Sequence, residues 1–248
     1  MSAPIRYVLL GLAVVATPAF GAGALSSDRP GFSTAPYTVA PGSWQLEAGY
    51  LHAESDDGRT DREVIPEAVL RTGIAGPLEL NLAMNGYVRT ERGGSSESGI
   101  GDFAMGFKAG TATTSVGNFG ALARVTLPTG DAPGTVDDPG LTAALLWDRG
   151  IRPGTSLFGT LQADFADAFG DSTTTWTPAI GVSTTLVDRL GGFVEYYAQI
   201  PEEGDTAHTV DLGLTWLATA DLQLDFHLGA GLNDEAEDFA GFGLAHRF

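Results

Sequence analysis

Apolar and polar residues alternate along most of the chain from residue 43 onward. The alternation is clearest in the segments 43–53, 78–89, 102–111, 156–165 and 222–232. A period of two predicts β-strands with one apolar and one polar face, and no comparable stripe with a 3.6-residue period follows residue 25. Seven further segments fit the same scheme: 62–72, 119–127, 141–148, 174–186, 192–200, 208–217 and 239–248. The pattern therefore predicts an all-β protein of about twelve strands.

Longer, acidic connections alternate along the chain with shorter connections that carry few acidic residues. Six are longer and acidic, and together they carry eighteen Asp and Glu residues: 54–61, 90–101, 128–140, 166–173, 201–207 and 233–238. Five are shorter and carry only Asp188 and Asp221: 73–77, 112–118, 149–154, 187–191 and 218–221. Long loops at one end and short turns at the other are typical of a transmembrane antiparallel up-and-down β-barrel, which we predict for 43–248.

The polar faces support this prediction, because in a barrel they line the interior while the apolar faces contact lipid. Closure also satisfies every backbone hydrogen bond within the membrane. The alternative is a secreted soluble β-protein, which would place these charges outside. The predicted pore-lining residues are Glu47, Glu79, Asn81, Arg89, Lys108, Arg124, Gln162, Asp164, Glu195, Asp211, Asp225, His227 and Arg247.

The first 24 residues have the layout of a secretory signal peptide. One basic residue, Arg6, precedes an apolar run over 7–16, and Ala22-Gly23-Ala24 offers small residues for cleavage. The run is too short for a spanning helix, which needs about 20 residues. We therefore expect export, with the mature chain starting near Leu25. Residues 25–42 show no alternation, and they are predicted either to lie in the periplasm or to enter the lumen as a plug.

Composition excludes several classes of protein. The net charge of −18 leaves no basic stripe to displace counterions from phosphate, so nucleic-acid binding is excluded. The absence of cysteine removes disulfides, thiolate metal sites and cysteine nucleophiles. Hydrophobic residues make up 43% of the chain, too many for disorder.

The sequence contains no motif that indicates an enzyme active site or a cofactor-binding site. A barrel phospholipase would need a serine, a histidine and an orienting asparagine, and none of the four histidines lies in a His-x-Ser context. The acidic loops lack the fixed spacing of a calcium site, so we interpret them as solvated surface, with divalent ions bridging them to lipopolysaccharide as a further option. We predict no enzyme, metal or cofactor.

Several short motifs resemble those of a known family, the "phenol MetA-pathway" family of outer-membrane transporters. They are Asp28-Arg29-Pro30-Gly31-Phe32-Ser33, Tyr37-Thr38-Val39, Gly42-Ser43-Trp44-Gln45-Leu46-Glu47, Gly99-Ile100-Gly101-Asp102, Leu127-Pro128-Thr129-Gly130 and Gly231-Leu232-Asn233, followed by Gly243 and Arg247-Phe248. The resemblance covers most of 28–248 and implies an outer-membrane channel-like protein, linked in some members to uptake of aromatic or other hydrophobic compounds.

These patterns predict a protein of the Gram-negative outer membrane that lets small neutral or cationic solutes pass without energy input. A closed structural or adhesion barrel without conduction is the alternative. The expected partners are membrane lipid and lipopolysaccharide, small solutes, and the barrel-assembly machinery, which would recognise the last strand ending in Phe248.

Overall fold

The computed structural model describes residues 25–55, 59–110, 114–168, 170 and 173–248. The predicted signal peptide, 1–24, lies outside the described residues. Within the described part of the chain, no helix is long and apolar enough to cross a membrane.

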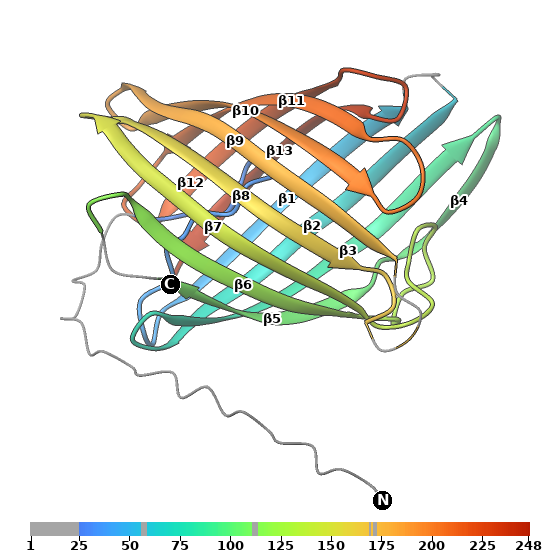
Figure 1. The fold of residues 1–248 in the computed structure, drawn as a ribbon, viewed down its shortest axis with the longest axis horizontal. Coiled ribbons are helices and arrows are strands. Elements are labelled where there is room, and N and C mark those ends of the chain that lie inside the picture. Colours follow the sequence, from blue (N-terminus) through green and yellow to red (C-terminus); the bar gives the residue numbers. More distant parts are fainter. Residues whose placement is uncertain (1–24, 56–58, 111–113, 169, 171–172) are drawn as a thin grey trace, which may run out of the picture.

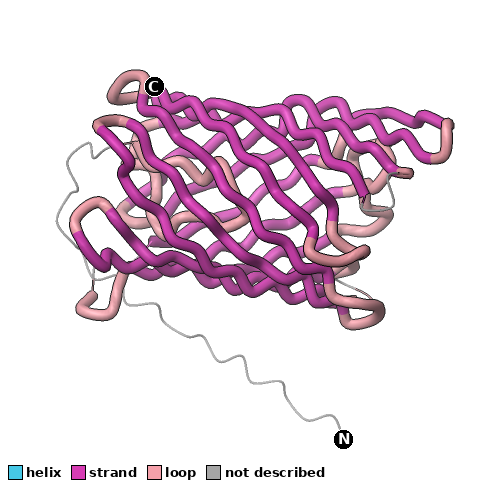
Figure 2. The backbone as a smooth tube through the Cα atoms, turned by 90° about the horizontal axis from the view of Figure 1, so that it is seen from above, coloured by secondary structure: helices cyan, strands magenta, loops and turns pink. Residues whose placement is uncertain are grey.

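Thirteen strands form one antiparallel sheet that closes on itself (Figures 1 and 2). Consecutive strands pair except β4 and β5, which both pair with β3, and β1 pairs with β13 to complete the ring. The strands are β1 (Trp44–Ser55), β2 (Thr60–Ala75), β3 (Leu78–Arg92), β4 (Ser95–Ile100), β5 (Phe103–Gly110), β6 (Asn118–Leu127), β7 (Gly140–Arg152), β8 (Thr155–Phe165), β9 (Thr174–Val187), β10 (Leu190–Pro201), β11 (Ala207–Leu217), β12 (Leu222–Gly231) and β13 (Glu237–Arg247). Ring closure leaves no free edge along the wall except the second edge of β4, which has no strand partner.

The barrel wall has twelve strands, because β4 and β5 lie end to end along the same neighbour. Residues 78–84 of β3 pair with β5, and residues 87–92 pair with β4. The interruption falls at Gly101 and Asp102, between the two strands. The predicted all-β barrel and its strand number are thus confirmed.

The segment 90–101 is a correction to the sequence prediction of a long loop. It continues β3 to Arg92, turns at Gly93 and Gly94, and returns as β4. Both glycines have positive φ angles, 56° and 87°, which a two-residue hairpin turn of this kind requires. This hairpin is polar on both faces, so it carried no alternation from which a strand could be predicted.

A phase shift in β2 and β3 reverses which residues face inward. Glu79 is fully buried and Val88 is only 5% exposed, although they lie nine positions apart and strict alternation would put them on opposite faces. Pro66 and Gly86 lie opposite each other between the pairs Ile65–Tyr87 and Glu67–Asn85, and β2 carries an irregularity against β1 at this level. An extra residue in a strand moves every following side chain to the other face.

The outward face of the wall is a continuous apolar surface. Large hydrophobic side chains from almost every strand are exposed there, among them Leu46, Met105, Phe107, Leu145, Leu161, Ile180, Val194, Leu212, Phe226, Leu228 and Phe242. Soluble monomers rarely expose such a surface, whereas a lipid-facing barrel requires one. The secreted soluble alternative is therefore wrong, and this is an outer-membrane protein.

Candidate functional site: the barrel interior

A buried cluster of charges occupies the interior at the level of β1, β2, β3 and β5. Arg71 lies at its centre and is fully buried. Its guanidinium donates from Nη1 to Glu47 Oε1 at 2.6 Å and from Nε to Glu79 Oε1 at 2.8 Å. Asn81 adds a hydrogen bond from Nδ2 to Glu79 Oε1 at 2.6 Å. Charge-assisted hydrogen bonds of this kind are short and directional, so they fix the side chains.

The N-terminal segment supplies a further carboxylate to the cluster. Lys108 Nζ donates to both oxygens of Asp28 at 2.8 Å, and Arg71 Nη1 lies 3.3 Å from Asp28 Oδ1. Burial alone would raise the pKa of the Asp28 carboxyl, but Arg71, Lys108 and Arg124 together hold this pKa below its ordinary value. Asp28 is therefore ionised at neutral pH and joins the segment to the wall electrostatically.

Carboxylates of the wall also bind backbone N–H groups of residues 25–42. Glu47 accepts from the amides of Asp28 and Arg29, at 3.0 and 3.1 Å to Oε2. Glu195 accepts from the amides of Phe32 and Ser33, at 3.0 and 3.1 Å. Glu79 accepts from the Val39 amide at 2.6 Å. In Figure 1 the segment is the blue trace that precedes β1 and runs inside the ring of strands.

Side chains of the same segment reach walls that are far apart in sequence. Arg29 Nη1 lies 2.9 Å from Glu67 Oε2 on β2, and Nη2 lies 3.2 Å from Asp225 Oδ1 on β12. The ring of Phe32 stacks on Tyr197 of β10, with 4.7 Å between centroids. A Cβ atom on Gly243 would lie 2.6 Å from Arg29 Nε, so the glycine at this position leaves the room that the Arg29 side chain occupies. Residues 25–42 thus contact opposite sides of the lumen.

A cavity of about 930 Å³ lies beside this segment, and we call it the chamber. Its lining mixes apolar side chains with charged ones of both signs. Apolar residues include Leu51, Val64, Val88 and Phe239, and charged residues include Arg29, Arg62, Glu67, Asp102, Arg124 and Glu237. Residues 132–136, from the loop between β6 and β7, form another part of its wall.

Several polar atoms at the chamber have no hydrogen-bond partner within the described residues. His227 is 93% buried, and neither ring nitrogen is bonded. Arg124 Nε and Arg29 Nε, on two other residues that line the chamber, are also buried and unpartnered, as is Oδ2 of Asp225, which does not line it. A buried polar group without a partner costs roughly 1–3 kcal/mol. Each of these atoms has almost no accessible surface, so water or a polar solute in the chamber reaches it only when neighbouring side chains move.

The predicted pore-lining residues divide into three groups. Eight are buried toward the interior: Glu47, Glu79, Asn81, Lys108, Glu195, Asp211, Asp225 and His227. Arg124, Gln162 and Asp164 are partly buried; Arg124 lines the chamber, and Gln162 Nε2 donates to Asp164 at 2.8 Å. Arg89 and Arg247 are not joined to these sets.

Arg89 differs from its prediction because of the phase shift at Pro66. Its side chain is 41% exposed and pairs with Glu91 at 2.7 Å and with Glu63 at 3.4 Å, while its neighbour Val88 faces the chamber instead. Arg247 pairs with Asp221 at 2.6 Å, at the turn between β11 and β12. Arg247 is the last residue of β13 and therefore lies away from the central cluster of charges.

Sequence reasoning missed Arg71, Asp28 and Arg29. Arg71 lies in a predicted strand, but the irregular alternation of 62–72 hid the face on which it lies. The other two belong to a segment without any period. The signal that could have found Arg71 is charge balance, since the predicted interior carried Glu47 and Glu79 with too few cations nearby.

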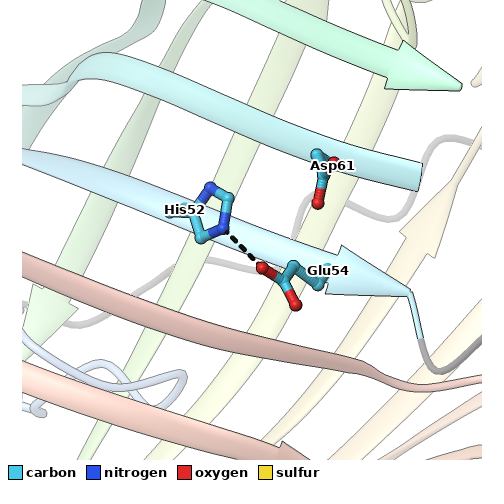
Figure 3. Close-up of side chains that lie close together, drawn as sticks. All are labelled: His52, Glu54 and Asp61. Atoms are coloured by element: carbon cyan, nitrogen blue, oxygen red, sulfur yellow. Dashed lines mark hydrogen bonds and ion pairs between the residues drawn. The ribbon is translucent and has the colours of Figure 1, made fainter. Parts of the chain in front are cut away.

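One group of potential metal ligands lies on the outside of the wall, away from the chamber (Figure 3). Atoms of His52, Glu54 and Asp61 lie within 4.8 Å of one another, and His52 Nε2 lies 3.0 Å from Glu54 Oε1. Two other histidines bond elsewhere: His208 Nδ1 to the Tyr196 hydroxyl, and His246 Nδ1 to the Asp221 carbonyl. No bond from a histidine to a serine occurs within the described residues.

The closed twelve-stranded wall, the apolar exterior and the charged interior define an outer-membrane β-barrel. The chain belongs to the family described as "Putative MetA-pathway of phenol degradation", whose profile matches residues 27–248. This confirms the resemblance in the motifs. A comparison with curated proteins gives no match.

Solved structures show the same fold at low sequence identity. An outer membrane channel from Pseudomonas putida F1 is 14% identical with a TM-score of 0.62, and the match covers 86% of this chain and 97% of that one. KdgM porin in complex with disordered oligogalacturonate is 12% identical with a TM-score of 0.53, covering 82% and 99%. The translocator domain of the autotransporter NalP from Neisseria meningitidis is 11% identical with a TM-score of 0.50, covering 83% and 87%.

Proposed function

We propose that the chain is a passive channel for small solutes, and that residues 25–42 act as its movable plug. The observation that carries this proposal is the chamber of about 930 Å³ inside a closed wall, lined by charged residues of both signs and by apolar side chains. A barrel that served only as a structural element would gain more by filling this space with side chains, since empty or unsatisfied interiors are costly.

Charge supports small neutral or cationic solutes as the transported class. The acidic connections, with eighteen Asp and Glu residues, repel anions within about one Debye length, roughly 8 Å at physiological salt. Family membership and the apolar part of the chamber, including Leu51 and Phe239, make aromatic or hydrophobic compounds a candidate class. We further propose that the long-loop end faces the cell exterior, as in other outer-membrane barrels.

No enzymatic step is part of this proposal. The interior offers binding groups and an electric field, both of which suffice to select solutes in channels. Contacts with membrane lipid follow from the exposed apolar wall. Bridging of Glu54 and neighbouring acids to lipopolysaccharide, and recognition of the last strand by the assembly machinery, are proposed partner interactions.

Planar-bilayer recording of refolded full-length protein tests the channel directly. We expect discrete conductance steps that favour cations over anions when KCl is placed in a gradient, because acidic groups dominate the loops. Heat-modifiable gel migration, which reports a folded barrel, serves as the control for refolding. A correctly folded barrel that passes no current in any salt, and that releases no small sugar from liposomes, would support the closed structural alternative instead.

A further inference from the structure

Two motifs from the sequence, Gly99-Ile100-Gly101-Asp102 and Leu127-Pro128-Thr129-Gly130, interlock in the structure. Asp102 Oδ1 accepts the amide hydrogens of Thr129 and Gly130, at 3.0 and 2.8 Å. Its other oxygen, Oδ2, accepts the amide hydrogen of Val136 at 2.7 Å. One carboxylate therefore satisfies three backbone donors of the loop between β6 and β7, which occupies residues 128–139 and, with the first residue of β7, is called loop 128–140.

Further bonds hold this loop against the junction of β4 and β5. The Ile100 carbonyl accepts from the amides of Asp131 and Ala132, at 2.9 and 3.1 Å. The Ile100 amide donates to Asp131 Oδ1 at 2.8 Å, and the Phe103 amide donates to Thr129 Oγ1 at 2.9 Å. Together these bonds form a ladder between the loop and the wall.

The glycines of both motifs permit this close approach. A Cβ atom on Gly130 would lie 2.5 Å from the Ile100 carbonyl oxygen, and one on Gly99 would lie 2.7 Å from the Ala132 amide nitrogen. Real Cβ atoms do not approach so closely, so a side chain at either position would push the loop away from the wall. The two motifs thus share one structural purpose.

The interlock turns the loop toward the interior. Ala132 is only 5% exposed and packs with Val64 and Val88, and residues 132–136 line the chamber. A loop that extended into solvent would leave Val64 and Val88 uncovered and would widen the chamber on this side.

We propose that Asp102 is a positioning residue that holds loop 128–140 inward and so sets the size of solute that the chamber admits. This inference rests on the proposed channel function. Loss of the carboxylate removes three charge-assisted hydrogen bonds at once. The loop should therefore leave the wall, while the barrel, whose strand pairings do not depend on Asp102, stays closed.

Loop docking is measured without reference to transport. The chain has no cysteine, so Ala132→Cys introduces one buried reporter for a maleimide. We expect this thiol to react slowly, and at least about tenfold faster when Asp102→Ala is added, since a tenfold change corresponds to 1.4 kcal/mol of docking free energy. Asp102→Asn should fall between, because its remaining oxygen can still accept from Thr129 and Gly130.

Asp137→Ala is the matched control. Asp137 lies in the same loop and carries the same charge, but it is exposed and makes no hydrogen bond or ion pair within the described residues. This variant should leave the Ala132→Cys rate unchanged. Heat-modifiable migration of each variant verifies that the barrel has folded.

Liposome swelling with a pentose, a disaccharide and a trisaccharide then measures solute size. We expect Asp102→Ala to speed the entry of the trisaccharide more than that of the pentose, and Asp137→Ala to change neither. Faster thiol reaction without any change in size preference would overturn the inference and leave the channel intact. If unaltered protein and every variant exclude all three sugars, the proposed function itself fails, whatever the thiol rates show.

Discussion

Arg71 and Glu79 form an ion pair in which neither side chain has any exposed surface, with 2.8 Å between Nε and Oε1. Glu47 lies on the other side of the same guanidinium, at 2.6 Å. One cation thus bridges two buried carboxylates on the strands that flank β2, and a third, Asp28, reaches it from the N-terminal segment. The stability of the wall and the placement of the segment therefore depend on the same residue.

Arg71→Met should destabilise the barrel strongly, because it leaves Glu47 buried without its cation and leaves Glu79 with only Lys108, whose Nζ lies 3.9 Å from Oε1. Breaking a buried pair in this way costs about 3–5 kcal/mol. The free energy of unfolding in urea, followed by intrinsic tryptophan fluorescence in detergent micelles, measures the loss. Arg247→Met is the control, since its partner Asp221 is 49% exposed and partly exposed pairs contribute about 0–1 kcal/mol. Equal losses in the two variants would contradict the assigned role of Arg71.

Arg29→Ala should favour the open state of the channel. It removes the contacts that join the segment to Glu67 and Asp225, and hydrogen bonds to charged groups contribute roughly 1.5–3 kcal/mol each. We expect the ratio of open to closed time in single-channel records to rise at least about tenfold, which 1.4 kcal/mol produces. Arg62→Ala, which removes a cation from the chamber but none from the segment, should leave this ratio nearly unchanged.

Asp28 should make plug docking sensitive to strongly acidic pH only. Its pKa is lowered from the ordinary value of 3.8, so its contribution is fully present above that value and is lost as the pH falls through 3.8 toward the lower value of the docked state. At pH 7, Asp28→Asn should therefore conduct more than the unaltered protein. The difference should vanish once the pH lies below the docked-state pKa. A difference that persists there would show that the carboxylate charge is not what holds the segment.

Deletion of Phe248 should impair assembly in cells more than folding in detergent. The backbone of Phe248 pairs with Trp44 at 2.9 and 3.1 Å, and its ring is 65% exposed, free to be recognised from outside the barrel. We expect a several-fold lower heat-modifiable fraction in outer membranes and an unchanged refolding yield in micelles. Phe248→Tyr should retain assembly. Equal losses in both settings would assign Phe248 a structural role alone.

The exterior of the barrel was predictable because lipid demands apolar side chains at every second position. This physical requirement placed Leu46, Phe107 and Phe226 outward and Glu47 and Lys108 inward. The hairpin of β3 and β4 has polar residues on both faces, so no such requirement acts on it and alternation could not reveal it.

The interior was less predictable, because it depends on register and on a segment without period. The irregularity at Pro66 and Gly86 exchanges the faces of Val88 and Arg89, and alternation carries no warning of such a shift. The contacts of Asp28 and Arg29 join residues up to 196 positions apart, which no local pattern encodes. The sequence contains the motifs of Asp102 and Thr129, but it gives no indication that the two residues contact each other.

The binding site of the N-terminal segment is formed by strands from both ends of the chain. Arg29 requires Glu67 on β2 and Asp225 on β12, and these strands come into one ring only when β13 meets β1. Before β13 pairs with β1, the two carboxylates that bind Arg29 are not held in one ring, so the segment has no complete binding site. On the proposal that this segment is a plug, a barrel whose last strand is missing should therefore be unable to hold it in place.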